Sequence, residues 1–266
     1  MPEVPELNLV GLTLQKHFKG QRVESIEILW KKRVKASQEE FDAKIPGGKL
    51  QSVTRNGKEL HLQFDNGNVL GIHMMLTGRM HLLPTDEEIK YPIFRLIFEN
   101  EAGIAVADGM GQAKPILNPE IPDVPDIMSE EFSLDYLKGI LAKRSKKIKE
   151  LILDQKVMRG IGNAYADEIL WHSKISPFSD ANAIPAGKVK DLFESIKSVT
   201  KEATDGLEKL KLNDKVFEME NYDHRFIHNS SKKYAPDGYE ILKGKVGTSK
   251  TYYTDNQVLY DIINRK

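Results

Sequence analysis

The sequence predicts an α+β multidomain protein: an N-terminal β-sandwich with flanking helices, then a helical domain, then a C-terminal β-hairpin. Short apolar segments with turn residues between them fill residues 23–106, a pattern typical of a sandwich or barrel. Four prolines within residues 115–126 indicate a linker, and helical periodicity follows it. We therefore expect domains at 1–114, 129–220 and 221–266, with a linker at 115–128.

Composition limits the possible chemistry. The 266 residues include no cysteine, which excludes disulfides, thiolate metal ligands and cysteine nucleophiles. No apolar run reaches the length of a membrane span, and no signal-peptide pattern opens the chain. We expect a soluble, cytoplasmic monomer, nucleoid-associated if bacterial. Because 39 basic residues balance 39 acidic ones, any nucleic-acid binding has to come from local patches.

Periodicity places the N-terminal elements. Apolar residues at helical spacing predict a helix over residues 5–17, which Gly20 ends. Alternation predicts strands at 60–64 and 69–72, joined by a turn at Asn66-Gly67, a strong hairpin signal. Further strands are expected at 23–28, 94–98 and 103–106.

The C-terminal half is expected to be mainly helical. The pattern predicts helices at residues 132–141, 148–153, 163–173 and 189–207, and a hairpin around 245–253. Ser133 or Ser129 could cap the first helix. Pro177 lies shortly after the third helix and is expected to stop it.

The first six residues contain a possible nucleophile. Removal of Met1 before Pro2 would leave a secondary amine, and an α-amino group has a pKa of about 7.7–8.0. Such an amine adds to a sugar aldehyde carbon and gives an iminium, which is an electron sink. Glu3 and Glu6 are nearby acids or bases. The alternative is that Pro2 and Pro5 only stiffen the terminus and start a helix.

An internal stretch has the features of a phosphate site. Gly160 and Gly162 predict a tight turn, after which Asn163 is expected to cap a helix, with Lys156 and Arg159 close by. Residues 138–149 add six basic residues and no acid before Glu150, as phosphate-backbone binding requires. The alternative is a solvated helix face followed by an ordinary glycine turn.

Four stretches in order resemble the formamidopyrimidine-DNA glycosylase and endonuclease VIII family. They are Pro2-Glu3-x-Pro5-Glu6, residues 55–60 (RNGKEL), residues 73–78 (HMMLTG) and residues 151–177, which are similar to the family's helix-two-turn-helix element. The resemblance runs over nearly the whole chain. It implies a two-domain enzyme that binds DNA between the domains, excises damaged bases and cuts the strand by elimination.

The resemblance also implies roles for single residues. Pro2 would attack C1′ of the damaged nucleotide, Glu3 would act as general acid and proton shuttle, and Glu6 would assist. Lys58 would hold a phosphate beside the lesion and help elimination. Glu168 would line the cleft. The expected DNA contacts are Lys58, Leu76, Lys156, Gly162, Asn163 and Lys250.

The C-terminal hairpin departs from the family pattern. The four zinc-binding cysteines of the family's finger fall on Tyr234, Asp237, Thr254 and Gln257, a poor donor set for zinc. We expect no metal, no cofactor and a zincless finger held by packing of Tyr234, Tyr239, Tyr252 and Tyr253. The finger's arginine position holds Ser249, which puts a second elimination in doubt, although Lys245 or Lys250 could still touch phosphate.

Two DNA-contacting elements of the family are also changed. Leu76 matches the first of three side chains that fill the gap left by a flipped base, but Met110 and Gln112 stand where the family has Arg and Phe. A Lys-His-x-His element appears as Lys90-Tyr91-Pro92-Ile93. We expect weak discrimination of the opposite base, or a substrate other than ordinary duplex.

The leading hypothesis is a bifunctional DNA glycosylase and abasic-site lyase of base excision repair. It would act on damaged duplex or single-stranded DNA through an iminium at Pro2, followed by β-elimination. The alternative is a binder of abasic, branched or bulky-lesion DNA that does not excise bases. A purely structural or protein-interaction module is a third hypothesis, which the intact N-terminus disfavours.

Overall fold

The computed structural model describes residues 2–86, 88–209 and 225–262. These residues form two compact units: residues 2–122 together with 207–209, and residues 123–206 together with 225–262, which include the C-terminal hairpin. Among the described helices, none combines the length and apolar character of a membrane-spanning segment.

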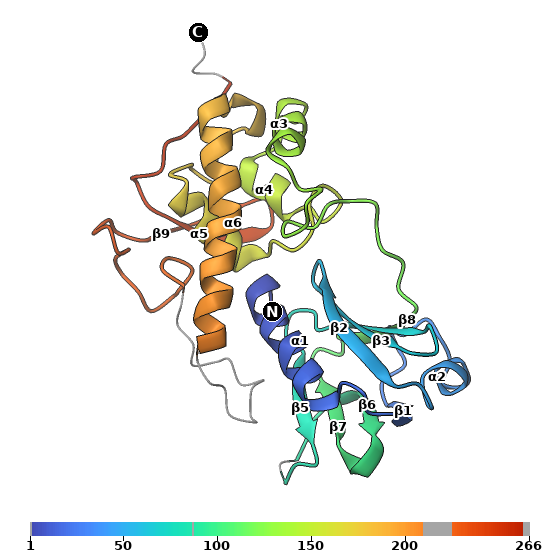
Figure 1. The fold of residues 1–266 in the computed structure, drawn as a ribbon. Coiled ribbons are helices and arrows are strands. Elements are labelled where there is room, and N and C mark those ends of the chain that lie inside the picture. The colour runs from blue at the N-terminus through green and yellow to red at the C-terminus, as the bar shows by residue number, and fades with distance from the viewer. Residues whose placement is uncertain (1, 87, 210–224, 263–266) are drawn as a thin grey trace. The chain divides into compact units, whose positions relative to one another are not determined.

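The first unit contains two four-stranded antiparallel sheets (Figure 1). One has the order β1-β6-β7-β5, with β1 at Val23–Ile28, β6 at Pro92–Phe98, β7 at Gly103–Ala107 and β5 at Arg79–Leu83. The other has the order β2-β3-β4-β8, with β2 at Leu50–Asn56, β3 at Glu59–Phe64, β4 at Val69–His73 and β8 at Lys114–Leu117. The short helix α2 (Gln38–Lys44) is capped by Ser37, and residues Glu99–Glu101 form a 3-10 turn.

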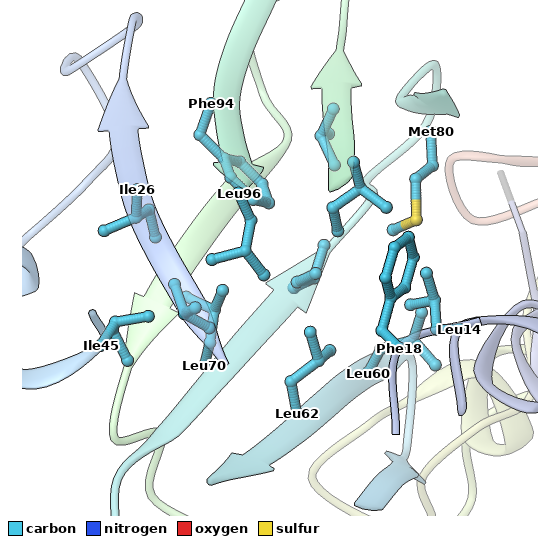
Figure 2. Close-up of a cluster of buried hydrophobic side chains, with 14 of the residues drawn as sticks. Leu14, Phe18, Ile26, Ile45, Leu60, Leu62, Leu70, Met80, Phe94 and Leu96 are labelled. Atoms are coloured by element: carbon cyan, nitrogen blue, oxygen red, sulfur yellow. The ribbon is translucent and has the colours of Figure 1, made fainter. Parts of the chain in front are cut away.

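The core of this unit collects apolar side chains from both sheets and from the N-terminal helix. Helix α1 (Val4–Phe18) presents a buried stripe with the spacing of one helix face. Its last residue, Phe18, stacks on Phe98 with ring centroids 4.6 Å apart. Figure 2 shows Leu14 and Phe18 of α1 among buried side chains of β1, β3, β4, β5 and β6. The helix is therefore fixed on the sandwich, and its N-terminus with it.

The strand register brings three loops to one end of the second sheet. Glu59 pairs with His73, and His73 pairs with Lys114. The β2–β3 turn that carries Lys58, the segment after β4 and the loop before β8 consequently lie at the same end, because antiparallel neighbours alternate in direction. This end of the sheet carries the residues of the candidate site.

The second unit is helical with one hairpin. Its helices are α3 (Leu134–Ala142), α4 (Ile148–Leu153), α5 (Asn163–His172) and α6 (Ala186–Lys209), with a 3-10 turn at Ala181–Ala183. Strands β9 (Leu242–Val246) and β10 (Ser249–Tyr253) pair directly across a two-residue turn that contains Gly247, whose φ is 56°. Such turns favour positive φ.

The predicted fold class is confirmed, and most predicted helices and strands are present within a few residues of their expected bounds. Ser133, one of the two proposed caps, accepts a hydrogen bond from the Tyr136 N–H at 3.1 Å. Strands β2, β5 and β8 and helix α2 were not predicted. Strand β8 takes up Lys114–Leu117, where the linker was expected to begin, because its residues pair with β4 despite Pro115.

Candidate functional site

The N-terminus of α1 holds the predicted nucleophile and acid. Glu3 is the N-cap of the helix and, with only 4% exposure, is buried. Its backbone N–H donates to Glu6 Oε2 at 3.0 Å, while its carboxylate accepts from the Glu6 N–H. This reciprocal capping box fixes the backbone of residue 3. Pro2, which is half-buried, is therefore attached to a rigid position.

Lys58 lies on the tight turn between β2 and β3, after Gly57, whose φ is 61°. Burial lowers the pKa of the Lys58 ammonium, and the nearby Glu3 carboxylate partly opposes this effect. The fold thus brings Lys58 close to Glu3, although the two are far apart in sequence. A secondary amine position, a carboxylate and an ammonium group meet in one place.

A second group of ionisable residues lies near Lys58 and includes His73, Glu59 and Lys114. Burial lowers the pKa of His73. The Glu59 charge opposes this shift, whereas the charges of Lys114 and Lys58 add to it. The Met75 N–H donates to His73 Nδ1 at 3.0 Å, so the neutral ring carries its proton on Nε2. Sequence reasoning assigned no role to His73 or Lys114. The signal that finds them is the cross-strand register, which sequence spacing alone does not give.

The loops beside this group of residues carry Leu76 and Met110, which are both exposed. The buried Asp108 carboxylate joins the loops: it accepts from the Thr77 hydroxyl and from the backbone N–H groups of Met110, Gln112 and Ala113. Burial opposes the Asp108 charge, but these hydrogen bonds hold its pKa below the usual range. Leu76 and Met110 are therefore presented on loops with a fixed backbone.

In the second unit, the glycine turn before α5 is held by one side chain. Gln155 accepts from the Gly160 N–H at 3.0 Å and donates to the Ile161 carbonyl at 2.9 Å. The prediction that Asn163 is the N-cap is wrong, because Gly162 occupies that position in an extended conformation. Asn163 is the first helical residue, and its Nδ2 donates to the Lys250 carbonyl at 3.0 Å. Lys156 is exposed.

Asp167 of α5 connects that helix to the hairpin. It accepts from Lys149 Nζ at 2.6 Å, from the Thr251 hydroxyl at 2.7 Å and from the Tyr252 N–H at 3.1 Å. His228 Nδ1 lies 2.7 Å from Oδ2, the oxygen that also accepts from the Tyr252 N–H. The side chains of Lys149 and Asp167 are both fully buried. Lys149 Nζ also donates to the Lys250 carbonyl at 2.9 Å, so one network sets the position of β10 on α5.

This network corrects the predicted basic patch at residues 138–149. Lys149 is not available to DNA, and three more members of the patch each lie within 4 Å of a carboxylate, one on the same helix and two from residues further along the chain. These pairs are Lys138–Asp135, Lys146–Asp154 and Lys147–Asp180. Arg159 also turns away from the expected phosphate site, since its Nε donates to the Val124 carbonyl at 2.6 Å.

Glu168 has a structural position in the second unit. Its side chain is 3% exposed and accepts from the backbone N–H groups of Phe226, Ile227 and His228 at 2.7–3.0 Å. Burial raises the pKa of this carboxyl, against the effect of the three hydrogen bonds. Glu168 also borders a hollow of about 330 Å³, and the expectation that it lines a DNA cleft stays a prediction. It anchors the segment that leads to the hairpin.

The four positions of the family's zinc ligands have other partners here. Asp237 pairs with Lys174 and accepts from Asn256 Nδ2 at 3.2 Å. Gln257 accepts from the Thr254 N–H at 2.8 Å and donates to the Ile175 carbonyl at 2.8 Å. Tyr234 is 56% exposed. These donors do not suit zinc, and the described residues contain no group of three or more His, Asp or Glu side chains able to hold a metal.

The predicted tyrosine packing is correct for only half of the set. Tyr252 is buried and contacts His228, and Tyr253 packs edge-on against Phe178. Tyr234 and Tyr239 are exposed, because hydrogen bonds and ion pairs to Asp167, Asp237 and Gln257 hold this segment instead. These polar contacts act together with an apolar cluster of Ile227, Ala235, Ile241 and Tyr252, against which Trp171 packs.

Comparisons with known proteins agree over both units. Residues 1–111 match the family model "Formamidopyrimidine-DNA glycosylase N-terminal domain", and residues 124–213 match "Formamidopyrimidine-DNA glycosylase H2TH domain". The formamidopyrimidine-DNA glycosylase of Lactobacillus helveticus is 33% identical over 213 residues, which cover 76% of this chain and 77% of the relative. The corresponding protein of Herpetosiphon aurantiacus is 32% identical over 213 residues, 75% of this chain and 77% of the relative.

Solved structures give the same result. The complex of Lactococcus lactis Fpg with DNA containing an abasic site matches with a TM-score of 0.83 and 25% identity, over 95% of this chain and 98% of that one. The complex of the same protein with DNA containing an oxidized pyrimidine has a TM-score of 0.83 and 26% identity, over the same shares of the two chains.

We expect Asp167→Asn to destabilise the second unit by about 3–5 kcal/mol, because it leaves the Lys149 charge buried without compensation. Urea unfolding followed by circular dichroism measures the change. Asp135→Asn is the matched control, since it removes an ion pair whose carboxylate is 93% exposed and such pairs contribute little. Equal effects of the two substitutions would contradict a structural role for the buried pair.

We expect the purified protein to carry far less than one zinc ion per chain by plasma mass spectrometry, even after expression with added zinc. A chelator should leave its DNA affinity unchanged, because the hairpin is held by protein groups alone. Stoichiometric zinc whose removal abolishes DNA binding would overturn this prediction.

Proposed function

Since the chain belongs to the formamidopyrimidine-DNA glycosylase family, we propose that Pro2 is the nucleophile with which it removes damaged bases and then cleaves the strand. The family combines DNA glycosylase and abasic-site lyase activity in base excision repair. The observation that supports these residue roles most directly is the position of Lys58 near Glu3 at the N-terminus of α1: burial lowers the Lys58 pKa, and the Glu3 carboxylate acts against this effect. The proposal requires removal of Met1.

In the first step the Pro2 nitrogen forms a bond to C1′ of the damaged nucleotide while the glycosidic bond breaks. The base leaves with the proton that the Pro2 amine gives up. Glu3 donates a proton to the sugar ring oxygen as the C1′–O bond opens, which leaves an iminium between Pro2 and C1′. Glu6 is a positioning residue in this scheme, because its carboxylate holds the Glu3 backbone N–H. The capping box therefore sets the direction in which the amine points.

In the second step the iminium accepts the electron pair released when a proton leaves C2′. The C3′–O bond then breaks and the 3′ phosphate departs, which is β-elimination. The Glu3 carboxylate, having lost its proton in the first step, is the acceptor nearest to Pro2 in sequence. The Lys58 ammonium binds the phosphate beside the lesion and stabilises charge on the departing oxygen.

The second unit supplies contacts to the DNA backbone in this proposal. Gly162 and Asn163 at the start of α5, together with Lys156, present donors to a phosphate. Lys250 and Lys245 are exposed on the hairpin and bind phosphate as point charges. Leu76 enters the gap left by the extruded nucleotide. The protein works as a monomer, and its bacterial relatives support a location on chromosomal DNA in the cytoplasm.

Abasic DNA is the first substrate to test, because the Lactococcus lactis protein is described in complex with it. Incubation with borohydride should trap a covalent adduct at the mass of the chain without Met1. Pro2→Gly keeps an amine and should retain partial activity. No adduct on any substrate, with gel shifts that persist, would favour a binder of damaged DNA that does not excise bases.

We expect Glu3→Gln to lower base excision by about 10²-fold or more, which is the usual contribution of a general acid. Cleavage of a pre-formed abasic site should fall much less than excision, since no base has to leave and water can accept the C2′ proton in place of the missing carboxylate. Single-turnover assays on the two substrates separate the effects. Glu27→Gln, on the exposed edge of β1, is the control. Normal excision by Glu3→Gln would refute the general-acid assignment.

We expect the basic limb of kcat/KM for abasic cleavage to lie below the pH at which an ordinary lysine titrates. Burial lowers the Lys58 pKa, so its charge is present at low pH and is lost earlier as pH rises. Lys58→Arg stays protonated and should move this limb to higher pH, while Lys58→Gln should lower kcat/KM at every pH. An unchanged limb in Lys58→Arg would show that another group sets it.

A further inference from the structure

The loop that replaces the family's Arg and Phe positions borders a hollow lined by aromatic rings. Trp30, at the end of β1, and Tyr91, before β6, are 44% and 68% exposed. They line a hollow of about 140 Å³ together with Met110, which is 54% exposed, and the backbone of Gly109 and Gly111. All of these residues belong to the first unit.

Trp30 and Gly111 are in close contact at the hollow. Trp30 Nε1 donates to the Gly111 carbonyl at 3.2 Å, and a Cβ at residue 111 would lie 2.7 Å from that nitrogen. Gly111 also has a φ of 60°. Glycine is therefore required here by close approach and by conformation. The Trp30 ring is held in place while a large part of its surface stays open to solvent.

The backbone of Tyr91 is also fixed. Tyr91 is a non-glycine residue with a φ of 55°, and its carbonyl accepts from the Asp108 N–H at 3.0 Å. Backbone outliers of this kind collect at functional sites. The same Asp108 bonds Thr77, next to the exposed Leu76. Hydrogen bonds of Asp108 therefore connect the aromatic hollow to the loop that carries Leu76.

The charge beside the hollow suits a nucleic acid. Trp30 is followed directly by Lys31, Lys32, Arg33 and Lys35, all of which are exposed. Cations next to open aromatic faces are the combination that binds single-stranded nucleic acid. This run escaped the sequence reasoning, which counted only the run at residues 138–149. The hollow is also smaller than the usual 300–1,000 Å³ of a cofactor pocket.

We propose that Trp30 and Tyr91 form a stacking site for one unpaired nucleobase of the bound DNA, with Met110 as its apolar neighbour and residues 31–35 on the phosphates. The inference rests on the proposed function, because it assumes that DNA lies at this end of the sheet. Stacking uses the π-face that every base possesses. The site therefore accepts any of the four bases, in contrast to readout by an arginine that hydrogen-bonds base edges.

Fluorescence tests the site directly. The chain has two tryptophans, so Trp171→Phe leaves Trp30 as the single emitter. We expect Trp30 emission to be quenched by single-stranded DNA and by duplex with a non-cleavable abasic analogue opposite any normal base, with affinities within about threefold across the four bases. Fully paired duplex should quench much less. Equal quenching by all DNAs, or none, would overturn the proposal.

Paired substitutions separate stacking from packing. Trp30→Phe keeps a π-face and should bind the abasic-analogue duplex within about threefold of wild type. Trp30→Leu keeps apolar bulk, and both variants lose the hydrogen bond to Gly111. Trp30→Leu should nevertheless bind about tenfold more weakly, which is within the range for one base–aromatic stack. Tyr91→Leu should act in the same direction, and Leu29→Ala, beside Trp30, should have no effect.

Borohydride trapping on the same variants keeps the two proposals distinct. If wild type gives no adduct, the function proposed for Pro2 fails, whatever the fluorescence shows. If wild type gives the adduct but Trp30→Leu and Trp30→Phe bind equally well, the stacking site fails and the Pro2 mechanism stands.

Discussion

The buried ion pair between Lys149 and Asp167 determines how the second unit is built. Two charges without solvent exposure are tolerated only when further hydrogen bonds satisfy them. Here the additional partners are the Thr251 hydroxyl, the Tyr252 N–H and the Lys250 carbonyl. Because these groups all belong to β10, the requirement to satisfy the pair also fixes the hairpin on α5. The same carbonyl holds Asn163, so the glycine turn and the hairpin share one polar anchor.

The first unit uses a buried lysine differently. Lys58 is half-buried near Glu3, and its pKa stays below the ordinary value because burial outweighs that attraction. Lys149, in contrast, has a carboxylate oxygen at 2.6 Å. An ammonium that is only partly compensated is suited to gain a phosphate partner, whereas one that is fully paired is suited to support the fold. Burial of a lysine by itself therefore does not indicate its role; the partner does.

Local patterns predicted the elements well. The helical spacing in α1, the Asn66-Gly67 turn and the long apolar stripe of α6 all depend on residues close in sequence. The N-terminal motif and the glycine turn were likewise found from the sequence, as was the loss of the four thiolates.

The remaining features depend on contacts between distant residues. Nothing near Lys149 in sequence shows that Asp167 neutralises it, and nothing near Glu168 shows that it accepts three N–H groups from residues 226–228. His73 and Lys114 became part of the site only through the register of β4 and β8. Strand β8 was missed because Pro115 resembled linker composition, although an edge strand tolerates proline.

A finger that is held without cysteine contains no thiol that can be oxidised. Zinc-binding thiolates are oxidised by the same reactive oxygen species that damage bases, and this oxidation releases the metal. This chain has no cysteine at all, and the groups around Asp167 and Gln257 do not take part in thiol redox chemistry. The hairpin is therefore expected to keep its structure in the oxidising conditions under which base lesions accumulate.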